Sequence, residues 1–195
     1  MIPKLIRLGV ETILKIICEK IIIKNIQIIN KNIKFNGIID ELYIKAESII
    51  FNKINISNIS INLKEVVLRL PFKKRKFLID NCHAVINMRL TKDNINKTLI
   101  NNRWQSLKAS IESYISMSFQ SIDINNKSIY FISSDALANK KVSYTLQYDR
   151  SNISLVNNIN QEKLSILNDE NITVNNVLFN QQYIELELSS KIKFN

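Results

Sequence analysis

Few residues of this 195-residue chain have the types and spacing that catalysis requires. The sole histidine, His83, alternates with Cys82 and Ala84, so it falls on the polar face of a predicted strand, where we expect it to be solvated. Neither a glycine-rich phosphate loop nor a zinc-protease motif occurs, and the chain has only two glycines. Asp93 is the best-placed carboxylate, but the helix dipole explains an anion in the first turn of a helix. The sequence therefore predicts a protein without enzymatic activity and without a cofactor.

The two cysteines do not form the spacing of a metal site or a disulfide framework. Cys18 and Cys82 lie far apart and in different contexts, and one histidine is too few for the common zinc ligand sets. We therefore expect two reduced cysteines that pack among apolar side chains, and no bound metal.

The most concentrated charge lies in one short segment between two predicted strands. Its residues are Phe72, Lys73, Lys74, Arg75, Lys76 and Phe77. The segment is interpretable as a solvated loop, a nucleic-acid patch or a surface for anionic lipid. A platform for nucleic acid interleaves cations with aromatic side chains, and here two phenylalanines only flank the run. Each cation near acidic headgroups contributes about 1 kcal/mol, so we predict that this segment binds lipid headgroups, and nucleic acid is the least favoured of the three partners.

Positive charge is also concentrated in the first part of the chain. Residues 1–76 contain 15 Lys and Arg against 6 Asp and Glu, whereas residues 77–195 contain 12 against 11. A codon bias towards lysine would spread charge along the whole chain. The asymmetry instead predicts an anionic partner for the N-terminal half.

Residues 1–20 are predicted to form an amphipathic helix. Lys4, Arg7, Glu11 and Lys15 recur at helical spacing, and apolar residues fill most other positions. The apolar face is wide, so it either covers an open sheet or lies in a membrane interface or lipid cavity. No run reaches the roughly 18 apolar residues of a transmembrane helix, and charges interrupt any signal-peptide core. We expect a cytoplasmic protein that is peripheral at a membrane.

Most of the remaining chain alternates between apolar and polar residues, which is typical of strands with one buried face. Within residues 54–63 the apolar set changes phase between Ile56 and Ile59, which predicts a β-bulge. Residues 91–118 interrupt the strands with a helical pattern. Thr91 is the expected N-cap, and Asn101 with Asn102 is expected to divide the segment into two helices.

We predict one domain, residues 1–195, of the α+β class. Its main feature is a long curved antiparallel sheet rolled into an elongated, barrel-like half-pipe, with an N-terminal amphipathic helix and a central helical insertion. Such a sheet must pack on its helices or curl on itself to cover its apolar face.

Residues 37–67, GIIDELYIKAESIIFNKINISNISINLKEVV, resemble the LmeA-like phospholipid-binding family, in particular its cyanobacterial form. The matching positions in this part are Gly37, Ala46, Phe51, Ile54 and Ile56, and those of a following helix start are Leu90, Thr91, Asp93, Ile95, Asn96 and Leu99. The order and spacing are kept from about residue 17 to the end. Asn52 and Lys53 depart from the pattern, because the family commonly has a glycine turn there.

The resemblance implies an elongated antiparallel barrel with a hydrophobic tunnel, and phospholipid binding without catalysis. It supplies no list of lipid contacts. From the apolar pattern we predict that acyl chains contact Ile6, Val10, Ile13, Ile17, Ile44, Ile56, Ile86, Met88, Leu107 and Ile111. The alternative function is that of a β-rich interaction scaffold with a solid core, whose basic N-terminal half binds an acidic protein or nucleic acid.

Overall fold

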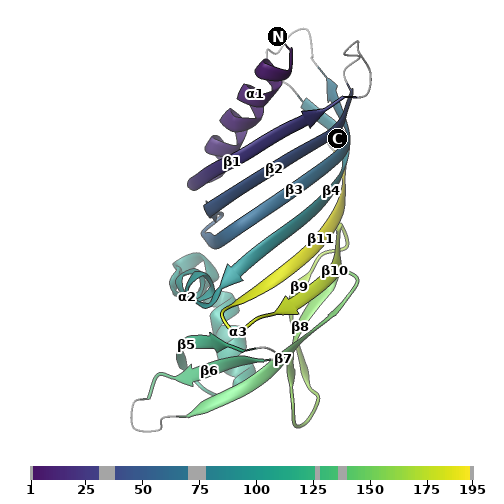
Figure 1. Ribbon diagram of the computed structural model, residues 1–195. Helices are drawn as coiled ribbons and strands as arrows, with labels where there is room; N and C mark the ends of the chain where they lie inside the picture. The colour runs from purple at the N-terminus through teal and green to yellow at the C-terminus, as the bar shows by residue number, and fades with distance from the viewer. Residues whose placement is uncertain (1, 31–37, 70–77, 126–127, 136–139, 194–195) are drawn as a thin grey trace.

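The computed structural model describes residues 2–30, 38–69, 78–125, 128–135 and 140–193 (Figure 1). It confirms the predicted α+β class, with an antiparallel sheet curled into a half-barrel, an N-terminal helix and a central helical segment. The described strands form two sheets where we expected one. Sheet A has the strand order β1-β2-β3-β4-β11-β10, and sheet B has the order β5-β6-β7-β8-β9.

The helices and strands have the following bounds. The helical elements are α1 (Ile2–Ile17), α2 (Lys92–Ile100), the 3-10 turn η1 (Asn102–Trp104) and α3 (Gln105–Ile115). Sheet A contains β1 (Lys20–Ile29), β2 (Ile38–Phe51), β3 (Ile54–Arg69), β4 (Leu78–Thr91), β10 (Ile172–Phe179) and β11 (Tyr183–Lys193). Sheet B contains β5 (Phe119–Ile124), β6 (Ile129–Ser133), β7 (Lys141–Asp149), β8 (Asn152–Asn157) and β9 (Lys163–Asn168).

The molecule is elongated, with α1 near one end and sheet B with α3 near the other (Figure 1). Strands β1 to β4 follow one another through antiparallel hairpins, and β4 then pairs with the C-terminal strand β11 in an unbroken register. In that pairing Ile86 lies opposite Leu188, and Leu90 lies opposite Ile184. Residues 92–168 are thus an insertion between two parts of sheet A.

Helix α1 covers part of the apolar face of sheet A with a single ridge of side chains. Ile6 is buried, and Val10 and Leu14 are half-buried against a cluster that includes Ile39 and Leu42. These three helix residues are spaced by four, and such a ridge fits the groove of a neighbouring surface. Only one row of the apolar side chains of α1 therefore packs against the sheet, although apolar residues occupy most of the helix circumference.

The central helical segment begins and divides where the sequence predicts. The Thr91 hydroxyl accepts a hydrogen bond from the Asn94 N–H at 3.2 Å, and the Asn94 side chain accepts one from the Thr91 N–H at 3.0 Å. This reciprocal arrangement is a capping box. Asn101 ends α2, and its side chain accepts from the Arg103 N–H at 3.1 Å to begin η1.

The β-bulge predicted within residues 54–63 is not found there. Strand β3 pairs with β2 in an unbroken register from Ile54 to Val67. The irregularity lies in the neighbouring strand, where β2 has one extra residue relative to β1 next to Ser48, whose φ is 50°. A second irregularity follows at Glu65, with a φ of 55°, where the register between β3 and β4 shifts. Ile56 and Ile59 still share one apolar cluster, so the phase change itself is real.

The largest core cluster of the described residues lies between sheet B and α3. Phe131 packs edge-on against both Phe119 and Tyr144, with ring centroids 5.0 and 5.8 Å apart. Ile111 of α3 and Ile184 of β11 join the same cluster, so it connects sheet B to sheet A. Buried aromatic pairs of this kind contribute about 0.5–1.5 kcal/mol beyond the burial of their area.

Candidate functional site

Helix α1 has a second apolar face that nothing in the described chain covers. The exposed fractions are 57% for Leu5, 61% for Leu8, 43% for Ile13, 76% for Ile16 and 50% for Ile17. At about 100° per residue, these side chains occupy roughly half of the helix circumference, beside the packed ridge. Single exposed apolar residues are ordinary, but a contiguous set of five on one helix marks an interaction surface. We call these five residues the outer face of α1.

The polar ridge of α1 completes the helix and supplies its charge. Arg7 donates through Nε to Glu11 Oε1 at 3.1 Å, one turn further along. Within the part of the chain that the structure describes, neither Lys4 nor Lys15 has an ion-pair partner. Two free ammonium groups therefore lie on the helix that has the exposed apolar face, an arrangement that suits an interface between acidic headgroups and acyl chains.

The predicted acyl-chain contacts lie in several places instead of in one interior. Ile6, Val10, Ile44 and Ile86 belong to the cluster under α1, and Ile86 also contacts the cluster between sheets A and B. Ile56 and Met88 pack near Cys18 and Ile21 at the start of β1. Leu107 and Ile111, which belong to α3, pack in the cluster beside sheet B.

Ile13 and Ile17 do not join these clusters, because both side chains are exposed on α1, and their contact with acyl chains stays a prediction. Ile13 differs from the buried Ile6 by only about 20° around the helix, so the sequence pattern treats them alike. The packed ridge rotates around the helix by about 40° for every four residues, however. By the second half of α1, contact with the sheet has moved from the side of Ile13 to that of Leu14.

The predicted headgroup-binding segment, Phe72, Lys73, Lys74, Arg75, Lys76 and Phe77, lies outside the described residues. The described chain leaves β3 at Arg69 and resumes at Leu78, and these two residues are paired. The role of this segment therefore stays a prediction from the sequence.

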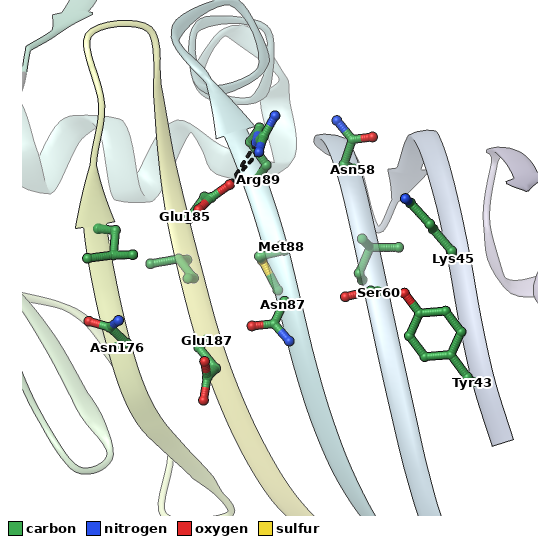
Figure 2. A pocket seen from close by; sticks show the side chains of 13 residues that line it. Tyr43, Lys45, Asn58, Ser60, Asn87, Met88, Arg89, Asn176, Glu185 and Glu187 are labelled. Atoms are coloured by element: carbon green, nitrogen blue, oxygen red, sulfur yellow. Dashed lines mark hydrogen bonds and ion pairs between the residues drawn. The ribbon is translucent and has the colours of Figure 1, made fainter. Parts of the chain in front are cut away.

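Sheet A has an open hollow on its polar face, which the sequence analysis did not predict. Its volume is about 440 Å³, and it spans β2, β3, β4, β11 and β10. Figure 2 shows Tyr43 and Lys45 on one side of it and Asn176 on the other. Tyr43 and Lys45 alternate with buried residues of β2, so the period of two that buries one face also builds this one. We call this feature the polar hollow.

A second open hollow, of about 400 Å³, continues the polar face towards the other end of β4. His83 lies there, opposite Lys191 of β11. The imidazole is exposed and its neighbours Cys82 and Ala84 are buried, as the sequence predicts.

The two thiols and the Asp123 carboxylate have shifted pKa values. Burial raises the pKa of the Cys18 and Cys82 thiols, which disfavours the thiolate, and both side chains pack among apolar residues as predicted. Burial also raises the pKa of Asp123, but the Ile124 N–H and Lys141 outweigh it, so the net pKa lies below its ordinary value. Among the described residues, no group of three or more His, Cys, Asp and Glu side chains could hold a metal.

No family model, curated protein or solved structure matches this chain. The resemblance to the LmeA-like family therefore stays a prediction. No helix in the described ranges has the length and apolar character needed to cross a membrane.

Proposed function

We propose that this chain is a non-catalytic phospholipid-binding protein that docks peripherally on an anionic membrane through the outer face of α1. The observation that carries the proposal is the exposure of Leu5, Leu8, Ile13, Ile16 and Ile17 on one helix beside unpaired lysines. The N-terminal excess of positive charge and the resemblance to a phospholipid-binding family support it.

The energetics favour docking through apolar contact. Burying a Leu or Ile side chain contributes about 1.5–3 kcal/mol, so covering five that are on average a little over half exposed contributes roughly 4–8 kcal/mol. Each nearby lysine adds about 1 kcal/mol at an acidic surface. Apolar insertion is therefore the larger part of what α1 contributes to the binding free energy, and charge selects acidic membranes.

The finer proposal is that acyl chains reach the apolar face of sheet A between α1 and sheet B. Ile61, Ile86, Met88 and Leu186 lie on this face and are half-buried. Ile86 contacts both the cluster under α1 and the cluster shared with sheet B, so an apolar surface runs continuously between them.

Vesicle flotation tests the docking proposal. The wild-type chain should float with vesicles that contain phosphatidylglycerol, and the double variant Leu8→Gln/Ile16→Gln should stay in the dense fraction. The matched control is Ile100→Gln/Ile159→Gln, because these two isoleucines are also exposed but lie outside α1. Equal loss in the control, or flotation of the α1 variant at the wild-type level, would refute docking through this face.

A second candidate, the β-rich interaction scaffold, is favoured by how well the predicted acyl contacts pack against protein. Ile6, Ile44, Ile56 and Ile111 are each at most 5% exposed, because other side chains of the protein cover them. Native mass spectrometry of the purified chain separates the two functions. A co-purifying phospholipid supports lipid binding, whereas a mass equal to that of the bare chain, together with retention of an acidic protein, supports the scaffold.

A further inference from the structure

One row of polar side chains crosses the floor of the polar hollow. Lys45 pairs with Ser60, Ser60 with Asn87, Asn87 with Glu187, and Glu187 with Asn176. Each of five adjacent strands thus contributes one residue to the row, and all five residues line the hollow (Figure 2). Because strands lie about 4.8 Å apart, the three steps from Lys45 to Glu187 span roughly 14 Å.

The middle of this row has unused hydrogen-bonding groups. Among the described residues, none forms a hydrogen bond with the side chains of Ser60, Asn87 or the neighbouring Asn58. Hydroxyl and amide groups each donate and accept hydrogen bonds, as sugar hydroxyls do. Tyr43 lies at the β2 side of the hollow and offers an aromatic ring of the kind that packs against the C–H face of a sugar.

The charges of the hollow cancel. Lys45 and Arg89 oppose Glu185 and Glu187, and the Arg89 guanidinium is committed to Glu185, with Nε 2.9 Å from Oε1. Arg89 also lies over the Tyr183 ring at 4.2 Å from its centroid. An anionic ligand would find one free ammonium, that of Lys45, and a nearby carboxylate from Glu187. A small cation would be attracted by the Glu187 carboxylate and repelled by the Lys45 ammonium. The charge pattern therefore favours a neutral polar ligand.

From this geometry we propose that the polar hollow binds a neutral glycosyl group of about two sugar rings. The hydroxyls of the sugar hydrogen-bond to Asn58, Ser60 and Asn87, and one ring packs on Tyr43. The volume of about 440 Å³ lies within the usual range for small-molecule sites, about 300–1,000 Å³. The same chemistry is met in a free saccharide and in the sugar headgroup of a lipid. This site is separate from the outer face of α1, so it does not depend on the docking proposal.

Saturation-transfer NMR tests the site with four probes. Two are free maltose and free lactose, and two are diacylglycerols that carry maltose or lactose as the headgroup and are presented in phosphatidylcholine vesicles. We expect a signal with at least one of the four probes and a loss of about tenfold in affinity in the Ser60→Ala/Asn87→Ala variant, because two hydrogen bonds are removed. The matched control is His83→Ala, which changes an exposed side chain on the same strand and face, four residues before Asn87.

The probes separate the sources of the sugar. Binding of a free sugar identifies a saccharide site, and binding of only the lipid-linked form identifies a glycolipid headgroup. Glycerol phosphate is the charged comparison and should give no signal that depends on Asn87. The proposal is overturned if all four neutral probes fail, if glycerol phosphate alone binds, or if His83→Ala lowers affinity as much as the hollow variant does.

Discussion

The Glu19 carboxylate joins the end of α1 to the β2–β3 turn by holding Lys53 twice. Glu19 Oε1 accepts a hydrogen bond from the Lys53 backbone N–H at 3.1 Å, and Oε2 pairs with the Lys53 ammonium. The Glu19 N–H also donates to the Ile50 carbonyl at 2.8 Å. These contacts fix the position where the chain leaves α1 and enters sheet A, so they position the outer face.

The contact between Glu19 and Lys53 should make stability depend on pH. The hydrogen bond from the Lys53 side chain is the main cause that holds the pKa of Glu19 below its ordinary value of 4.5. A lowered pKa stabilises the fold fully above 4.5, and this contribution is lost as the pH falls through the lowered value. Glu19→Gln should therefore have a slightly lower Tm than wild type at neutral pH, since the pair is exposed, and the difference should disappear in acid. Circular dichroism melts measure it, and a difference that persists at pH 3 would contradict this assignment.

Lys53→Gly should stabilise the protein. Asn52 and Lys53 have φ values of 52° and 64°, the left-handed pair of a tight hairpin turn that favours glycine. Relief of this strain is worth about 1–2 kcal/mol, and the extra freedom of glycine in the unfolded chain offsets about 0.5–1 kcal/mol. The exposed ion pair to Glu19 contributes little. Chemical denaturation should show a small net gain, whereas Lys53→Ala, which keeps the strain, should show none.

The same substitution at two isoleucines of α1 should change the free energy of unfolding by very different amounts. Ile6 is 5% exposed beneath the helix and Ile16 is 76% exposed on the outer face. Ile6→Ala should lower the free energy of unfolding by about 2–5 kcal/mol, because it leaves a cavity. Ile16→Ala should change it by less than about 0.5 kcal/mol. Urea titration of both variants checks the packed ridge, and similar losses in the two would show that the ridge is wrongly identified.

Neutralising the basic run should weaken binding to acidic vesicles in a salt-dependent way. In Lys73→Gln/Lys74→Gln/Arg75→Gln/Lys76→Gln, four cations are removed, each worth about 1 kcal/mol at an acidic surface. Affinity for phosphatidylglycerol vesicles should fall at least tenfold, and added salt should weaken the wild type more than the variant. The control is binding to neutral phosphatidylcholine vesicles, which should be weaker than wild-type binding to acidic vesicles and equal for both proteins.

Local sequence predicted the features that local interactions determine. Thr91 and Asn94 form their capping box within four residues, and the helical periodicity of residues 2–17 is a property of one segment. The alternation around His83 likewise identified the polar face of β4. These features need no knowledge of distant partners.

Features that depend on the pairing of distant strands could not be predicted from the sequence. The polar hollow exists because Asn87 lies between Ser60 and Glu187, and the pairing of β4 with β11 joins residues about a hundred positions apart. The division into two sheets has the same cause, since residues 92–168 are inserted between paired strands. Alternating polar residues in each strand were visible, but their alignment into one row requires the strand order.

Docking through the outer face of α1 requires that this face enters the acyl region of a membrane, which tryptophan fluorescence can measure directly. In a Trp104→Phe background, Ile16→Trp reports from that face and Ile159→Trp from an exposed turn in sheet B. With phosphatidylglycerol vesicles that contain lipids brominated on their acyl chains, we expect a blue shift and strong quenching for the tryptophan at position 16, and neither effect at position 159. Unquenched fluorescence at position 16 while the protein is bound to the vesicles would contradict docking through this face.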